Sequence, residues 1–135
     1  MKLTAVLTVS AISVITVSCS LMSRWSSPTA IAPDDVAGLV EAGIEAYNNG
    51  DITAAKSHLE AALRSPRAKS LKTTRARVQF YLAAVAWDVG DVKKTDVHLH
   101  RCLSLQPRFE PNWTFFAPGL RKRYEEAKLK VRIKR

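Results

Sequence analysis

Histidine and cysteine, the side chains that most often bind metals or act as nucleophiles, are few in this sequence: three histidines and two cysteines. His98 and His100 are two positions apart and so point to different sides of a helix, whereas metal ligands on one helix need a spacing of four. Cys102 has apolar neighbours at helical spacing, so core packing is expected for it. The sequence also lacks a phosphate loop, a nucleophile elbow and a glycine-rich dinucleotide turn. We therefore expect no enzyme, no metal site and no cofactor.

Helices are the elements expected to position the remaining candidate residues. From Asp34 onward Ala, Leu, Glu and Lys dominate, and apolar residues recur three and four positions apart. Asp34 or Asp35 follows a proline and is expected to cap the first helix. The run from Asn48 to Asp51 is expected to end this helix and to cap a second one. The pattern predicts an all-α fold that starts with a helical hairpin.

The corner of this hairpin recurs 40 residues later in the chain, at Gly90-Asp91. Superposing Gly50-Asp51 on that second corner also aligns Leu59 with Leu99, Ala62 with Cys102 and Leu63 with Leu103. Agreement at this many positions indicates an internal repeat.

Both units resemble the tetratricopeptide repeat, a helical hairpin of about 34 residues with small side chains where its helices cross. The family positions in the first unit are Gly43, Gly50, Ala55, Leu59 and Ala62, with Pro66 closing one residue early. Those in the second unit are Ala83, Gly90, Leu99, Cys102 and Pro107, with Thr95 where alanine is expected. The resemblance implies two hairpins, residues 36–66 and 74–107, stacked as an α-α superhelix and joined by a basic connector over residues 65–74.

The segment after Pro107 departs from the repeat. Its prolines disfavour helix as far as Pro118, and a charged helix is expected to follow. One face of this helix would cap the open end of the stack through Leu120, Tyr124, Ala127 and Val131, with Trp113, Phe115 and Phe116 packed beneath. Residues 108–135 are thus the predicted capping segment of a helical domain over residues 34–135.

Repeats of this kind line a concave surface with the first helix of each pair, so the resemblance implies a groove for a protein partner. Tyr47 and Trp87 fall at equivalent positions of the two units. Aromatic side chains beside Asn48 and Asp88 suit an extended peptide or an amphipathic helix, although internal packing of both rings is an equal alternative. The expected lining residues are Val40, Ile44, Tyr47, Asn48, Phe80, Ala84, Trp87 and Asp88.

Positive charge is in excess, with 21 Lys and Arg against 12 Asp and Glu and a net charge of +9. One basic cluster extends from Arg64 to Arg77, and the other lies at the C-terminus. Such clusters attract anionic lipid, acidic polymers or acidic proteins, so a cationic surface-binding protein is the alternative function. Nucleic acid is an expected partner only if the chain is not exported. The C-terminal basic patch comprises Arg121, Lys122, Arg123, Lys128, Lys130, Arg132, Lys134 and Arg135.

The start of the chain resembles a bacterial lipoprotein signal. Lys2 precedes an uncharged run from Leu3 to Ser18, and Cys19 follows. The resemblance implies that residues 1–18 are removed, that Cys19 is acylated and that residues 19–33 form a flexible tether. An ordinary cleaved signal, an uncleaved anchor and a buried helix of the fold are the alternatives.

These features predict an envelope adaptor or scaffold that binds a protein partner, is held at the membrane by a lipid anchor and assists the assembly of an envelope machine. Ser20 beside the modified cysteine favours the outer membrane, with the domain facing the periplasm. An inner-membrane anchor or secretion is the alternative. Two repeats make a short stack, so a homodimer that shares open ends remains a further alternative.

Overall fold

Helical segments follow one another along the chain in the computed structural model, which describes residue 32 and residues 35–133. Within that part of the chain there is no strand, so the predicted all-α class is confirmed for these residues. The elements are α1 (Val36–Asn48), α2 (Ile52–Arg64), the 3-10 helix η1 (Pro66–Ser70), α3 (Lys72–Asp88), α4 (Val92–Leu105), the 3-10 helix η2 (Trp113–Phe115) and α5 (Pro118–Ile133).

Aspartate caps begin three of the helices. The side chains of Asp35, Asp51 and Asp91 each accept a hydrogen bond from the backbone amide three residues further on, at 2.9, 2.9 and 3.0 Å. Such bonds satisfy amides that have no partner inside the helix. The predicted starts of α1 and α2 are therefore confirmed, with Asp35 rather than Asp34 as the first cap.

The two Gly-Asp corners have the same backbone hydrogen bonds. The Gly50 and Gly90 amides each donate to the carbonyl three residues earlier, at 3.0 and 2.9 Å. The Asp51 and Asp91 amides each donate to the carbonyl five residues earlier, at 2.9 and 2.8 Å. Both glycines have positive φ, 80° and 77°, which side chains with a Cβ rarely adopt. Equivalent corners thus end α1 and α3 and start α2 and α4.

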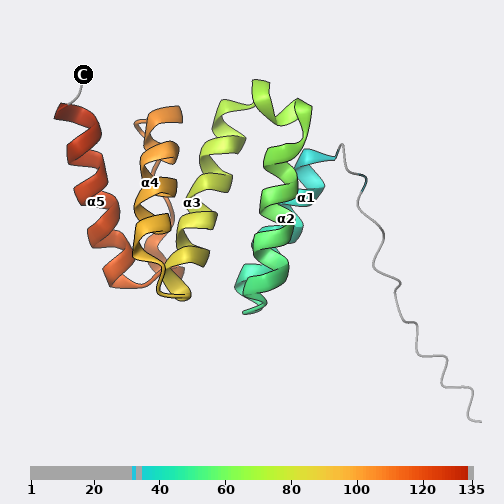
Figure 1. The fold of residues 1–135 in the computed structure, drawn as a ribbon, viewed down its shortest axis with the longest axis horizontal. Coiled ribbons are helices and arrows are strands. Elements are labelled where there is room, and N and C mark those ends of the chain that lie inside the picture. The colour runs from blue at the N-terminus through green and yellow to red at the C-terminus, as the bar shows by residue number, and fades with distance from the viewer. Residues whose placement is uncertain (1–31, 33–34, 134–135) are drawn as a thin grey trace, which may run out of the picture.

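The helices form a curved row in which neighbours along the chain lie side by side (Figure 1). Helix α1 packs on α2, α3 packs on α4, and α5 packs on the free side of α4. The 3-10 helix η1 joins the end of α2 to the start of α3 along one edge of the row. This connection is shorter than the sequence predicted, because η1 is followed at once by α3, which begins at Lys72.

Two hydrophobic clusters hold the row together, one for each hairpin. The first lies between α1, α2 and α3 and contains Val36, Leu39, Val40, Ile44, Leu59, Ala62, Ala68, Val78 and Leu82. The second lies between α3, α4 and α5 and contains Ala76, Phe80, Ala83, Ala84, Leu99, Cys102, Leu103, Leu120, Tyr124 and Ala127. Because α3 contributes to both clusters, it fixes one hairpin against the other.

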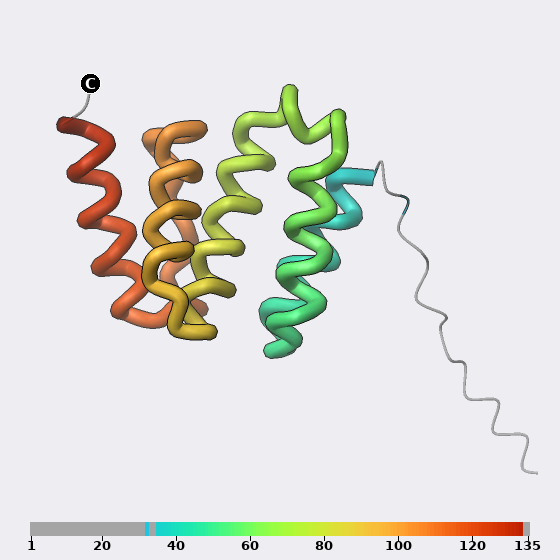
Figure 2. The backbone as a smooth tube through the Cα atoms, in the orientation of Figure 1, coloured from blue at the N-terminus to red at the C-terminus, as the bar shows by residue number. Residues whose placement is uncertain are grey.

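The C-terminal segment covers the second hairpin as predicted. Leu120, Tyr124 and Ala127 are buried on one face of α5. The chain before this helix passes behind α3 and α4 (Figure 2), and the buried Tyr124 hydroxyl donates a hydrogen bond to the Phe109 carbonyl there. One prediction was wrong: Phe115, in η2, is 74% exposed rather than packed beneath α5.

The predicted lipoprotein signal, Cys19 and most of the tether lie outside the described residues. Among the helices that are described, none is both long and apolar enough to cross a membrane.

Candidate functional site

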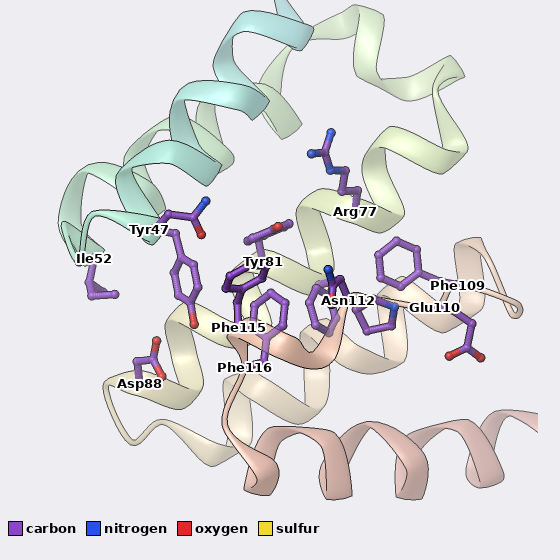
Figure 3. Close-up of a pocket in the computed structure, with 14 residues that line it drawn as sticks. Tyr47, Ile52, Arg77, Tyr81, Asp88, Phe109, Glu110, Asn112, Phe115 and Phe116 are labelled. Atoms are coloured by element: carbon purple, nitrogen blue, oxygen red, sulfur yellow. The ribbon is translucent and has the colours of Figure 1, made fainter.

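A cleft of about 820 Å³ lies where the first corner, α3 and the segment before α5 face one another (Figure 3). The corner supplies one end, α3 supplies the floor and the segment over residues 109–116 supplies the opposite wall. Residues far apart in the sequence thus form one site. The lining comprises Tyr47, Asn48, Gly50, Ile52, Arg77, Phe80, Tyr81, Asp88, Phe109, Glu110, Pro111, Asn112, Phe115 and Phe116.

Aromatic rings make up much of the cleft surface and pack against one another. The Tyr47 and Phe116 rings are stacked, with centroids 5.9 Å apart and planes at 26°. Tyr81 meets Tyr47 edge to face at 5.8 Å, and Phe80 meets Phe116 edge to face at 4.9 Å. Such pairs fix the ring positions and add to the stability that burial provides. The cleft is therefore a preformed aromatic surface.

Asp88 is the acidic group that interacts with Tyr47 of this surface. The Tyr47 hydroxyl points toward the Asp88 carboxylate (Figure 3). Burial, followed by the interaction with the Asp88 carboxylate, raises the pKa of Tyr47 above its usual value, so the phenol stays protonated. A carboxylate beside aromatic faces favours a cationic or hydrogen-bond-donating group in the occupant of the cleft.

The other charged groups of the cleft are paired. The Arg77 Nη1 lies 2.7 Å from the Glu41 Oε1, and Glu110 forms an ion pair with Lys128 of α5. The Asn112 side-chain oxygen accepts from the backbone and the hydroxyl of Thr114, at 3.1 and 2.8 Å. These contacts hold the wall segment, residues 109–116, in place. Of the two carboxylates that line the cleft, Asp88 has no ion pair among the described residues.

No protein-family model matches this chain, and comparisons with curated proteins and with solved structures also find no match. The case for this site therefore rests on its geometry.

Of the eight residues that the sequence proposed for the groove, four line the cleft and four do not. Tyr47, Asn48, Phe80 and Asp88 line the cleft, although Phe80 is 1% exposed and forms its floor. The other four do not line it, because α2 and α3 cover the apolar face of α1, while α4 and α5 cover that of α3. These four are Val40, Ile44 and Ala84, which are core residues, and the half-buried Trp87.

Trp87 packs against the last helix instead of facing the cleft. A Cβ added to Gly119 of α5 would lie 2.5 Å from the Trp87 Cζ2, so the indole lies directly against that backbone. This contact is of the packing kind that the sequence left open as the alternative to binding for this ring.

Sequence reasoning missed the wall of the cleft, which comes from Phe109, Pro111, Phe115 and Phe116. The sequence places these residues in the capping segment. The segment has no helical periodicity, so the sequence does not show which side chains would face a cleft. The available signal was composition: aromatic side chains alternate there with prolines, which are common in exposed binding segments.

His98 is half-buried and Cys102 is buried in the fold, whereas His100 is exposed. His98 shares a hydrogen bond with Gln79 at 2.7 Å, and burial, followed by the charge of Arg101, lowers its pKa. Burial raises the pKa of the Cys102 thiol to about 12. Residues 35–133 contain no group of three or more potential metal ligands.

The C-terminal basic patch is partly neutralised by contacts within the fold. Arg123 lies 3.3 Å from Asp96, Lys128 pairs with Glu110, and the Arg121 guanidinium lies 5.9 Å from the Trp113 ring centre. Ion pairs within residues 35–133 include none with Lys122, Lys130 or Arg132, whereas Lys134 and Arg135 lie outside the described residues.

Proposed function

We propose that this protein is an adaptor that binds a segment of a partner protein in the aromatic cleft and is tethered to the bacterial envelope by its N-terminus. The observation that carries the proposal is the cleft itself, which has about 820 Å³ of space bounded by six aromatic side chains. Concave apolar surfaces with a few polar groups are the usual form of peptide-binding sites.

Phe115 is the residue expected to contribute most to binding. Its ring is 74% exposed at the edge of the cleft, so it is accessible to a partner. Burying such a ring against a partner contributes about 2 kcal/mol. Aromatic anchors of this kind dominate the binding energy of many interfaces.

The polar groups of the cleft favour an extended peptide or an amphipathic helix that carries a basic or amide group. Asp88 would accept from that group, and Asn48 would bind the peptide backbone. The apolar side chains of the partner would then lie against Tyr47, Tyr81 and Phe116.

The family resemblance supports an adaptor rather than an enzyme. Paired helices with the same Gly-Asp corner, 40 residues apart, are expected of a tetratricopeptide-type stack, whose output is binding. The matching corner hydrogen bonds agree with that assignment. The proposed envelope location rests on Lys2, the uncharged run and Cys19 alone. Mass spectrometry of the mature N-terminus should detect a diacylglyceryl group on Cys19, and an unmodified thiol would contradict the tether.

Co-purification of a partner from detergent-solubilised envelope tests the adaptor role. Phe115→Ala should abolish recovery of a protein that the wild-type chain retains, because the anchor ring is lost while the core is untouched. The matched control is Leu129→Ala, which removes a 59% exposed side chain of α5 that does not line the cleft. Equal recovery by wild type and Phe115→Ala would refute the cleft as the binding site.

Binding through the C-terminal basic patch is the alternative, and the exposed Lys122, Lys130 and Arg132 favour it. Each basic residue near an anionic membrane contributes about 1 kcal/mol. Vesicles of phosphatidylglycerol should then bind the chain at low salt and release it at high salt. The double change Lys130→Glu and Arg132→Glu would abolish this binding and leave partner recovery through the cleft unchanged.

A further inference from the structure

A second hollow, of about 600 Å³, lies between α2 and α4 and has α3 as its floor. We call it the trough. It is bounded by the second helix of each hairpin, whereas the aromatic cleft is formed by the first corner, α3 and the segment before α5. Ile52 borders both, and no aromatic side chain lines the trough. The trough is therefore a separate surface with different chemistry.

Aliphatic side chains line the trough, and two of them, outside α3, are exposed. Leu82, Val85 and Ala86 of α3 are largely buried beneath it. Val89 is 63% exposed and Val97 is 47% exposed, so they account for two of the six large exposed apolar side chains of the described fold. Apolar side chains gathered in a hollow indicate a surface that is covered in use.

Cations dominate the sides of the trough. Lys56 pairs with Glu60 at 4.0 Å on α2, and Lys94 pairs with Asp91 at 2.7 Å on α4, so these four charges balance. The two that remain are Lys93 and Arg101 of α4, which take part in no ion pair within residues 35–133.

Two unpaired cations therefore lie along one side of the trough. His98, which also lines the trough, is hydrogen-bonded to Gln79, and its burial, followed by the charge of Arg101, lowers its pKa and favours the neutral form. The net charge of the lining is thus +2, from four cations and two acids.

We infer that the trough binds a short amphipathic helix of a partner protein, with its apolar face on Val89 and Val97 and its acidic side chains against Lys93 and Arg101. The charge of the lining selects an acidic occupant, and the aliphatic floor requires an apolar stripe.

The length of the trough fits about two turns of such a helix. Lys93 and Arg101 are eight positions apart on α4, which corresponds to about 12 Å along the helix axis. A partner helix that lies along α3 would therefore present apolar residues at i, i+3 or i+4, and i+7. Its acidic residues would flank that stripe on the edge that faces α4.

The test uses the full-length chain in mild detergent and two fluorescein-labelled peptides of about 16 residues, long enough for partial helicity. Both peptides carry leucine at the i, i+3, i+4 and i+7 positions, and they differ only in having glutamate or lysine on the flanks. Anisotropy should report binding of the glutamate peptide and much weaker binding of the lysine peptide. The double change Lys93→Glu and Arg101→Glu should weaken binding of the glutamate peptide at least about fivefold, since attraction is replaced by repulsion.

Two further variants separate the trough from the aromatic cleft. Val97→Ala should weaken binding about threefold to tenfold, because two methyl groups are lost from the contact. Phe115→Ala should leave it unchanged, since that ring lies in the cleft. The inference is overturned if the glutamate peptide does not bind at millimolar concentration, if both peptides bind equally, or if Phe115→Ala rather than the trough variants removes binding. None of these results would contradict the adaptor function of the cleft.

Discussion

Replacing Gly43 by alanine should destabilise the fold, although alanine is the better helix former. Gly43 lies on α1 where this helix crosses α2. A Cβ at this position would lie 2.7 Å from the Leu59 Cγ, 2.9 Å from its Cδ2 and 3.3 Å from its backbone nitrogen. Leu59 is fully buried in the first cluster, so its side chain has no free space to move into.

The size of the effect follows from two opposing terms. Overpacking of an enclosed site costs about 2 to 3 kcal/mol when the neighbour cannot move. The gain in helix propensity from glycine to alanine returns up to about 1 kcal/mol. The free energy of unfolding should therefore fall by about 1 to 2 kcal/mol for Gly43→Ala.

Urea denaturation followed by circular dichroism would measure this change. Repeating the measurement in a Leu59→Ala background tests whether contact with Leu59 is the cause. Leu59→Ala alone should cost about 2 to 5 kcal/mol, since it leaves a cavity. In that background the added methyl group of Gly43→Ala has room, so the same change should become stabilising by up to about 1 kcal/mol. Ser57→Ala, on the exposed face of α2, serves as a control for propensity without a steric term.

The sign reversal is the decisive outcome. An equal loss of stability from Gly43→Ala in both backgrounds would show that contact with Leu59 is not the cause. A rise in the free energy of unfolding of Gly43→Ala in the wild-type background would show that α1 and α2 can move apart without loss of stability. That result would contradict a rigid crossing at this position.

Three further changes test other parts of the structure. Tyr124→Phe removes the hydrogen bond to the Phe109 carbonyl and should lower the free energy of unfolding by about 1 kcal/mol in urea denaturation, while raising amide exchange in the cleft wall. Gly50→Ala and Gly90→Ala should each cost about 1 to 2 kcal/mol in thermal melts, because both positions need positive φ, and two results near zero would contradict the corners described above. Cys102 should resist iodoacetamide at pH 8 in the native protein, since burial raises the pKa of its thiol to about 12, and should react fully once urea unfolds the chain.

Local features of the fold were predictable because they depend on residues close together in the sequence. The caps at Asp35, Asp51 and Asp91 and the corners at Gly50 and Gly90 involve hydrogen bonds that span at most five positions. The same holds for the buried face of α5, which follows from the helical spacing of its apolar residues. Helical periodicity and turn chemistry were sufficient to predict these elements.

The candidate site was less predictable, because its wall and its floor come from distant parts of the chain. Phasing the first helix of each hairpin identified apolar faces at Val40 and Ile44, but it did not show that α3 covers them. It also placed Trp87 in the groove, whereas this ring packs on Gly119. The proline-rich segment has no period, so Phe115 and Phe116 could not be assigned to a surface.

Residue order alone specifies the helical class of this protein, the caps and Gly-Asp corners of its hairpins, and the apolar face of α5. Those properties depend on short-range hydrogen bonds and on side-chain spacing within one element. Which apolar face is covered and which stays open depended on packing between elements. The stacked rings of Tyr47 and Phe116, 69 positions apart in the sequence, show the reason: a contact between distant segments exists only after all the helices between them have packed.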